Sequence, residues 1–221
     1  MKTTCKRGAF IALLLASQGA AAHGSVQGLG NFFSGVVHPL FEPAHLIALI
    51  GLGLMLGQRG LARTHPAVPS FIGGSVLGLV AAGLGWAPNT DALLLALSVL
   101  AGLAVATAVS IPPAVCALTA GLVGLGVGLG SAPEATSGSA RIVMLVGTAV
   151  GGCVWMLNVV GLVHEVRRAW LLVLVRVAGS WITASAVLVL ALWVAGKPAS
   201  APTPTAAIRA AKPAQALDTS R

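Results

Sequence analysis

The feature that most constrains this chain is a succession of long apolar runs, each bounded by proline, glycine or arginine. Counting runs of about 20 residues between polar breaks predicts six membrane spans. Their approximate limits are 39–57, 67–86, 92–110, 112–130, 142–164 and 170–195. Backbone groups in lipid must be satisfied internally, and runs this long without alternation exclude a barrel. The sequence therefore predicts an all-α fold, a polytopic membrane bundle of six transmembrane helices.

The composition excludes the other broad classes of protein. Hydrophobic residues make up 57% of the chain and charged residues only 8%. A soluble domain carries about 25% charged residues, so a water-facing surface cannot be built from this inventory. The formal net charge of +8 does not indicate nucleic-acid binding, because the basic residues form no patch and lie mainly at loop ends and near the termini.

Residues 1–22 have the pattern of a secretory signal peptide. Basic residues precede the apolar stretch 10–15, and a run of alanines ends at Ala22. A basic region, an apolar region of roughly 7–15 residues and an A-x-A site define such a peptide. We expect cleavage after Ala22, which leaves His23 as the mature N-terminus. The alternative is an uncleaved first helix, for which the apolar stretch is short.

The loop charges predict the orientation of the bundle. Arg59 falls in the first loop expected inside the cell, and Arg167 and Arg168 fall in the last, in agreement with the positive-inside bias. We expect a transmembrane domain, residues 23–196, in the bacterial inner membrane, with both mature termini on the periplasmic side. The segment 197–221 is rich in proline and alanine and lacks an apolar period, which is typical of a flexible tail.

The richest polar cluster opens the first predicted span, in the sequence HPLFEPAH. On a continuous helix His38, Glu42 and His45 would share one stripe two turns long, although Pro43 removes a backbone donor and can break the helix. Ionisable groups inside a membrane are costly, so each is a functional candidate. Two imidazoles and a carboxylate suit a divalent transition metal such as nickel, cobalt or zinc. The alternative is a helix start whose histidines bond to nearby loops.

Other polar residues extend the candidate site. The free α-amine and the ring of His23 could together chelate a metal ion, and a solvated terminus is the alternative. Arg176 lies about a third of the way into the last span, where it could reach toward the cytoplasmic face or pair with Glu42. We expect Asn158 to make an interhelical hydrogen bond.

Glycines spaced four residues apart recur inside the predicted spans. Without a hydrophobic driving force between helices in lipid, such small residues allow backbones to approach closely. The pattern predicts a compact bundle. The pairs are Gly53/Gly57, Gly74/Gly78, Gly124/Gly128, Gly126/Gly130 and Gly147/Gly151.

Together these features resemble the HupE/UreJ family of hydrogenase and urease accessory proteins, which are thought to be nickel or cobalt permeases. The stretch HPLFEPAH looks like the family motif H-P-x-x-G-x-D-H, and Arg176 with Gly179 is similar to the R-x-x-G that opens the family's last helix. The resemblance implies functional roles for His38, His45 and Arg176. Here Ala44 stands at the family's aspartate position, with the carboxylate displaced to Glu42.

Two further departures concern the metal ligands. The family's histidine-rich H-G-x-A-H-G stretch has no counterpart in the fourth span, and Asn158 stands where a histidine is expected. Because a borderline cation prefers imidazole to amide, these changes predict weaker nickel binding.

Three functions remain open at this point. The resemblance implies a nickel or cobalt permease linked to hydrogenase or urease maturation. Such a protein is not an enzyme and has no tightly bound cofactor; its partners are the lipid bilayer, the divalent metal ion and nickel-enzyme maturation proteins. The second interpretation is a non-transporting accessory or assembly protein that retains the family fold. The third is a b-type haem carrier with His38 or His45 as an axial ligand.

Overall fold

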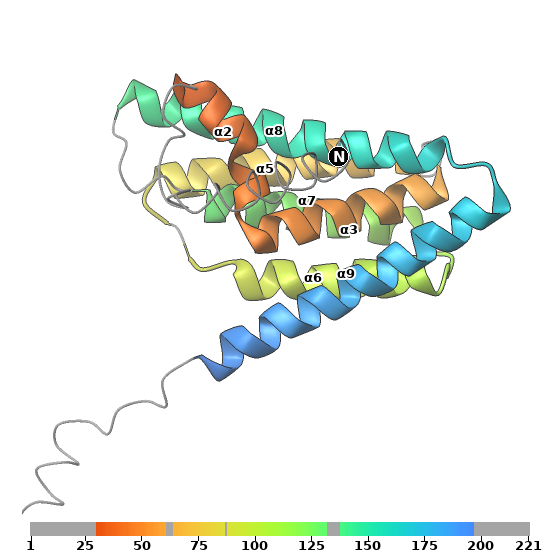
Figure 1. The fold of residues 1–221 in the computed structure, drawn as a ribbon. Coiled ribbons are helices and arrows are strands. Elements are labelled where there is room, and N and C mark those ends of the chain that lie inside the picture. The colour runs from red at the N-terminus through yellow and green to blue at the C-terminus, as the bar shows by residue number, and fades with distance from the viewer. Residues whose placement is uncertain (1–29, 61–63, 87, 132–137, 197–221) are drawn as a thin grey trace, which may run out of the picture.

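The structure is a computed structural model that describes residues 30–60, 64–86, 88–131 and 138–196. These residues form seven α-helices and no strand (Figure 1). The helices are α2 (Gly30–Phe41), α3 (Pro43–Arg59), α5 (Ala67–Gly83), α6 (Asp91–Ala106), α7 (Pro113–Gly130), α8 (Ser139–His164) and α9 (Ala169–Ala195). The predicted signal peptide, His23 and the predicted tail lie outside the described residues.

The helices agree with the predicted spans in position more closely than in length. Three of them, α7, α8 and α9, are long and apolar enough to cross a membrane alone, and the bent pair of α2 and α3 raises the number to four. The apolar helices α5 and α6 have 17 and 16 residues, a rise of roughly 25 Å, against a hydrocarbon core of about 30 Å. Six crossings therefore stay a prediction, whereas the all-helical architecture is confirmed.

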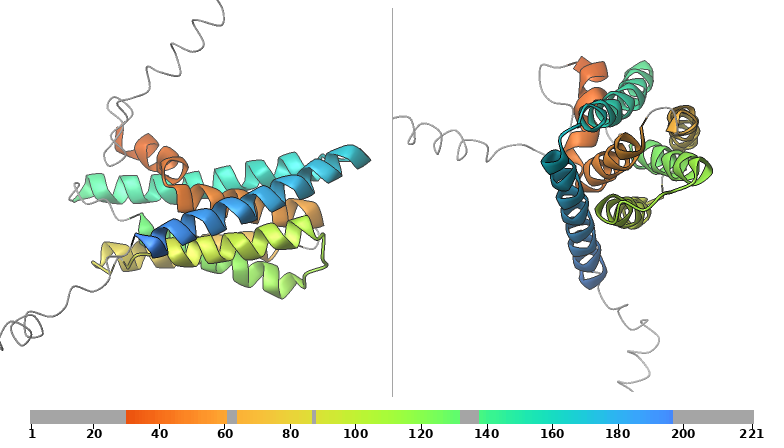
Figure 2. Two further views of the ribbon diagram at one scale, coloured as in Figure 1. Left: turned by 60° about the horizontal axis from the view of Figure 1, so that its bottom comes forward. Right: turned by 90° about the vertical axis from the view of Figure 1, so that its right-hand side faces the viewer.

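Helix α3 is the centre of the bundle. It contacts α6, α8, α9, α7 and α2, and the end-on view in the right panel of Figure 2 shows the other helices arranged around it. The closest pairs outside this centre are α5 with α7, α6 with α9, and α2 with α8. The central position explains why α3 contributes most to the core.

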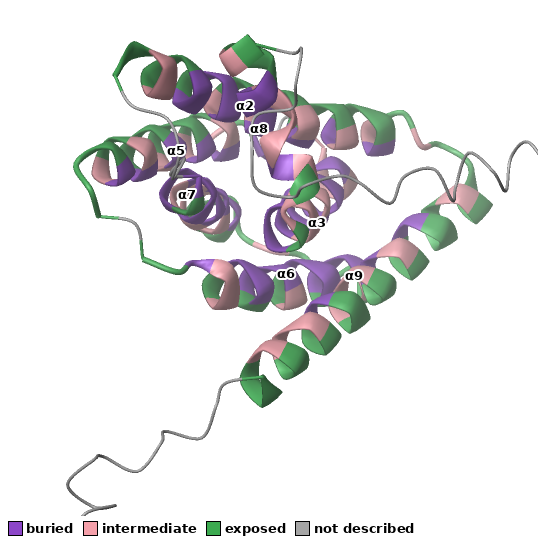
Figure 3. Ribbon diagram, turned by 60° about the vertical axis from the view of Figure 1, so that its left-hand side comes forward, coloured by how far each residue is buried: buried purple, intermediate pink, exposed green. Residues whose placement is uncertain are grey.

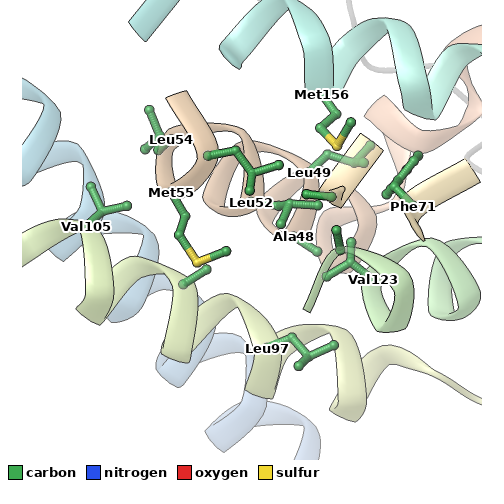
Figure 4. Packing of buried hydrophobic residues seen from close by; sticks show 14 of the residues in the cluster. Ala48, Leu49, Leu52, Leu54, Met55, Phe71, Leu97, Val105, Val123 and Met156 are labelled. Carbon is green, nitrogen blue, oxygen red and sulfur yellow. The ribbon is translucent and has the colours of Figure 1, made fainter. Parts of the chain in front are cut away.

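The burial pattern separates α3 from α9. Every residue of α3 from Gly51 to Gly57 is buried, and Leu49, Leu52 and Leu56 are almost inaccessible. Their side chains pack against residues of α5, α6, α7 and α8, several of which Figure 4 shows. In contrast, most of α9 is exposed (Figure 3), and only 11% of its most apolar window is buried inside the molecule. A helix that is apolar and exposed in this way suits a lipid environment.

The glycine pairs lie at helix interfaces, as the sequence predicts. A methyl group on Gly74 or Gly78 would meet the backbone of α7, and one on Gly124 or Gly128 would meet the backbone of α5. The two helices therefore pack glycine face to glycine face. The pairs at 53 and 57, 126 and 130, and 147 and 151 also face neighbouring side chains or backbone. Close approach through small residues is how this bundle is packed.

Candidate functional site

The first predicted span is broken at Glu42. Helix α2 ends at Phe41, α3 begins at Pro43, and the two axes are bent by 79° (Figure 1). Proline disfavours the helical conformation in the residue before it, and Glu42 is extended, with φ −93° and ψ 110°. Pro43 then occupies the first turn of α3, where its missing N–H is not needed. Of the two geometries that the sequence allows, the structure has the broken helix.

The break brings the two histidines of the motif together. His38 lies in the last turn of α2 and His45 in the first turn of α3. Their ring centroids are 6.0 Å apart and the ring planes meet at 76°. His38 is partly buried, whereas His45 is only 2% exposed.

His45 sits in a space that a glycine provides. A methyl group on Gly130, the last residue of α7, would lie 2.7 Å from His45 Nε2 and 2.9 Å from Thr90 Oγ1. The hydroxyl of Thr90 donates to the carbonyl of Gly126 (2.9 Å) and so ties the start of α6 to the end of α7. On the other side of the ring, His45 Nδ1 is buried and has no hydrogen-bond partner among the described residues. Buried polar atoms are normally bonded, so this nitrogen needs an explanation.

The carboxylate of the motif does not join the two imidazoles. Among the described residues, no three His, Cys, Asp or Glu side chains are grouped closely enough to hold a metal ion. Glu42 stands at the N-terminus of α3, and its side chain makes no capping hydrogen bond there. His23, the other predicted ligand, lies outside the described residues. The described site is therefore a pair of histidines.

A tryptophan that the sequence reasoning missed holds α2 in place. Trp155 of α8 donates its indole N–H to the carbonyl of Val36 (3.1 Å), two residues before His38. A tryptophan inside an apolar helix usually finds an acceptor for this N–H, and that rule is the signal that would have singled it out. Gly147 and Gly151 lie against α2 on the same side, where added methyl groups would overlap the carbonyls of Phe32 and Val36.

Arg176 lies at the opposite end of α3 from the histidines. It is exposed and donates through Nε to the carbonyl of Ala106 (2.9 Å), the last residue of α6. It pairs with no carboxylate of the described residues, so the predicted alternative of a pair with Glu42 is wrong. The physical reason is distance along the bundle, because Glu42 begins α3 whereas Arg176 packs beside its end.

Two other arginines also donate to backbone carbonyls at or near helix ends. Arg59 donates to the carbonyls of Met55 (2.6 Å) and Val109 (2.8 Å), and Arg141 donates to the carbonyl of Ala82 (2.8 Å) near the end of α5. Helix C-termini leave carbonyls without partners and carry partial negative charge, so guanidinium groups stabilise them. No sequence pattern predicts which carbonyls these arginines reach.

The prediction for Asn158 is wrong. Its amide donates to the carbonyl of Val154 (2.8 Å), four residues earlier in α8, and not to another helix. Asn158 is exposed on the outer face of α8, so the nearest acceptor belongs to its own helix. It lies apart from the histidine pair.

Comparisons with known proteins place the chain in a family. A family model described as HupE / UreJ protein matches residues 11–190. No curated protein and no solved structure matches the chain.

Proposed function

The chain belongs to the HupE/UreJ family, and from this premise we propose that it is a multi-pass membrane protein that carries a divalent transition-metal ion, nickel or cobalt, across the bilayer. His38 and His45 are its metal ligands in this proposal. The metal ion is cargo, and the enzymes that receive it are nickel enzymes of the hydrogenase or urease type.

The observation that carries the proposal is the buried Nδ1 of His45. A buried imidazole nitrogen with no described hydrogen-bond partner, on a ring 6.0 Å from a second imidazole at a helix break, supports a site that accepts a soft or borderline cation. Discontinuous helices are also where transporters place their ion sites. The resemblance predicted both histidines, and the geometry supports them as a pair.

The separation of the rings is compatible with one shared ion. Two imidazoles that bind a metal at about 2.1 Å have ring centroids roughly 5–6.5 Å apart, depending on the angle at the metal. The 6.0 Å between His38 and His45 falls within this range. Two ligands are fewer than a resident structural metal has, which suits an ion that must leave again.

The course of the chain supports six crossings and the proposed orientation. Gly57 near the end of α3 lies against Val163 near the end of α8, and Arg141 at the start of α8 bonds near the end of α5. Thr90 before α6 bonds near the end of α7. These contacts make consecutive helices from α3 to α9 run in alternating directions. Arg59 and the α8–α9 turn then share one end, which the positive-inside bias assigns to the cytoplasm.

The test is uptake of labelled nickel by cells that make the wild-type protein or His45→Gln. We expect uptake to fall about tenfold or more, because losing even an outer-sphere partner of a metal ligand costs about 10–100-fold in affinity. His164→Gln is the matched control, since His164 ends α8 at the other end of the bundle. Equal uptake by wild type and His45→Gln would remove His45 from the mechanism.

A second candidate function is a non-transporting accessory protein with the same fold. It is favoured by the absence of a three-ligand group among the described residues. Purified protein that binds nickel through His45, in cells whose nickel uptake does not depend on the protein, would support this role. Nickel uptake that depends on His45 would exclude it.

A further inference from the structure

A cleft of about 440 Å³ opens at the end of the bundle away from the histidines. Its walls are the end of α3, the loop between α6 and α7, and the first third of α9. Polar side chains from all three segments line it: Gln58 and Arg59, Ser110, and Arg176. Leu172 and the loop residues Ala108 and Val109 complete the lining.

Among the described residues, the lining of the cleft carries two positive charges and no negative one. Its lining contains Arg59 and Arg176 but no Asp or Glu. Both guanidinium groups bond to backbone carbonyls, of Met55 and Val109 for the first and of Ala106 for the second. Backbone carbonyls fix the orientation of a guanidinium group without neutralising it, so the charge of the cleft remains available to an anion.

The two arginines that line this cleft have N–H groups without a described acceptor, of which those of Arg176 are exposed. Arg59 Nε is buried and has no hydrogen-bond partner among the described residues. Arg176 uses only its Nε, which leaves its two terminal NH₂ groups without a described acceptor. An arginine fork held in this way matches the oxygens of a phosphate group.

The surface next to the cleft is apolar. Leu172 lines the cleft itself, and Val173 and Val177, which continue along α9, are 56% and 44% exposed. Trp170, in the first turn of α9, is 58% exposed. Tryptophan is enriched at membrane–water interfaces. Figure 3 shows α9 exposed along most of its length. A phosphate bound in the cleft would thus lie beside an exposed apolar surface.

We propose that this cleft binds the phosphate of an anionic phospholipid, with the acyl chains of the lipid lying along α9. Basic pockets between transmembrane helices bind such headgroups. The exposed apolar face of α9 is the reason to choose a lipid over free phosphate. The site is independent of the metal proposal, because it lies at the other end of α3 and shares no residue with the histidine pair.

The experiment uses the full chain in nanodiscs that contain equal amounts of phosphatidylglycerol and phosphatidylcholine, with retained lipid measured by native mass spectrometry. We expect phosphatidylglycerol to be retained selectively. Ser110→Glu introduces a competing carboxylate into the cleft and removes no described hydrogen bond, so its fold should persist. It should lower retention about fivefold, as should Arg176→Gln.

Arg167→Gln is the matched control. It removes one exposed positive charge from the same end of the bundle without touching the cleft, and retention should stay at the wild-type level. An equal loss in Arg167→Gln would overturn the proposal, because it would show attraction to charge in general. Equal retention of phosphatidylcholine would overturn it too. Displacement of the lipid by millimolar inorganic phosphate would show an anion site without a lipid and so overturn the choice of ligand.

Discussion

The two ends of α3 differ in how their polar side chains are hydrogen-bonded. At its start, the imidazole of His45 is buried with Nδ1 unpartnered, beside His38 and a helix break. At its end, Gln58 and Arg59 bond to the carbonyls of Val105, Val109 and Met55. The start of the helix leaves a buried imidazole nitrogen open, whereas the end makes three hydrogen bonds, two of them to residues outside α3, although Arg59 Nε is also buried without a described partner.

This difference separates a residue used for stability from one available for chemistry. A buried polar atom that is hydrogen-bonded stabilises the fold, whereas one without a partner costs stability unless a ligand supplies it. Arg59 ties the end of α3 to the loop that follows α6, through the carbonyl of Val109. The open nitrogen of His45 costs some stability, which the binding of a cation would offset under the proposed function.

Removing the hydrogen bonds of Arg59 at the end of α3 should have the largest effect on stability. Arg59→Gln loses charged hydrogen bonds to two carbonyls, and we expect the free energy of unfolding to fall by about 2 kcal/mol. The measurement is unfolding in detergent, followed by circular dichroism. Arg167→Gln, which changes the same charge at an exposed position, should stay within about 0.5 kcal/mol of the wild type. Equal stability of the two variants would show that the carbonyl contacts of Arg59 carry no weight.

Disturbing the open end should change metal binding more than stability. Gly130→Ala places a methyl group 2.7 Å from His45 Nε2 and must push the ring aside. We expect nickel affinity, measured by calorimetry on purified protein, to fall about tenfold. Gly161→Ala is the control, because nothing lies within 4 Å of the added methyl group there. Unchanged affinity in Gly130→Ala would mean that the position of this ring does not matter for the metal.

Removing the hydrogen bond that holds α2, and with it His38, against α8 should have a smaller effect on stability. Trp155→Phe removes the hydrogen bond to the carbonyl of Val36 and should cost about 0.5–1 kcal/mol, since hydrogen bonds within membranes contribute modestly. Faster amide hydrogen exchange in α2 would reveal the loss. Trp181→Phe on the exposed face of α9 serves as the reference and should exchange like the wild type. The same protection of α2 in both variants would contradict a supporting role for Trp155.

The smallest effect on nickel affinity is expected when the carboxylate of Glu42 is replaced. Because Glu42 does not group with the histidines, Glu42→Gln should change nickel affinity by no more than about twofold. Calorimetry on the same preparation measures this. A loss as large as that of His45→Gln would instead make Glu42 a ligand in the metal-bound form.

Much of the fold follows from the sequence because lipid imposes strict rules. Long apolar runs predict helices, and the glycine spacing predicts which helix faces pack closely, as Gly74 and Gly124 do. The motif also singles out His38 and His45, whose rings the structure places 6.0 Å apart. Periodicity alone could not choose between a continuous and a broken helix at Pro43, because that outcome depends on where α2 finds a packing partner.

Other parts of the site depend on contacts that a linear pattern does not encode. Residues 30–38 mix polar, small and apolar types, so their run is too weak to indicate a helix, yet they form most of α2, which packs on α8 with Gly35 against the backbone of Met144. The acceptors of Arg59 and Arg176 are backbone carbonyls, which have no sequence signature. Whether Asn158 faces another helix or the outside depends on how α8 is rotated in the bundle, which the sequence pattern does not show.

The bend at Glu42 has a mechanical consequence. Helix α2 is joined to α3 by the chain, but it packs mainly on α8, to which Trp155 and two glycines bind it. The position of His38 therefore depends on α8, whereas the position of His45 depends on α3. Any sliding of these two helices past each other would open or close the gap between the rings, so the proposed metal site would respond to the packing of the whole bundle.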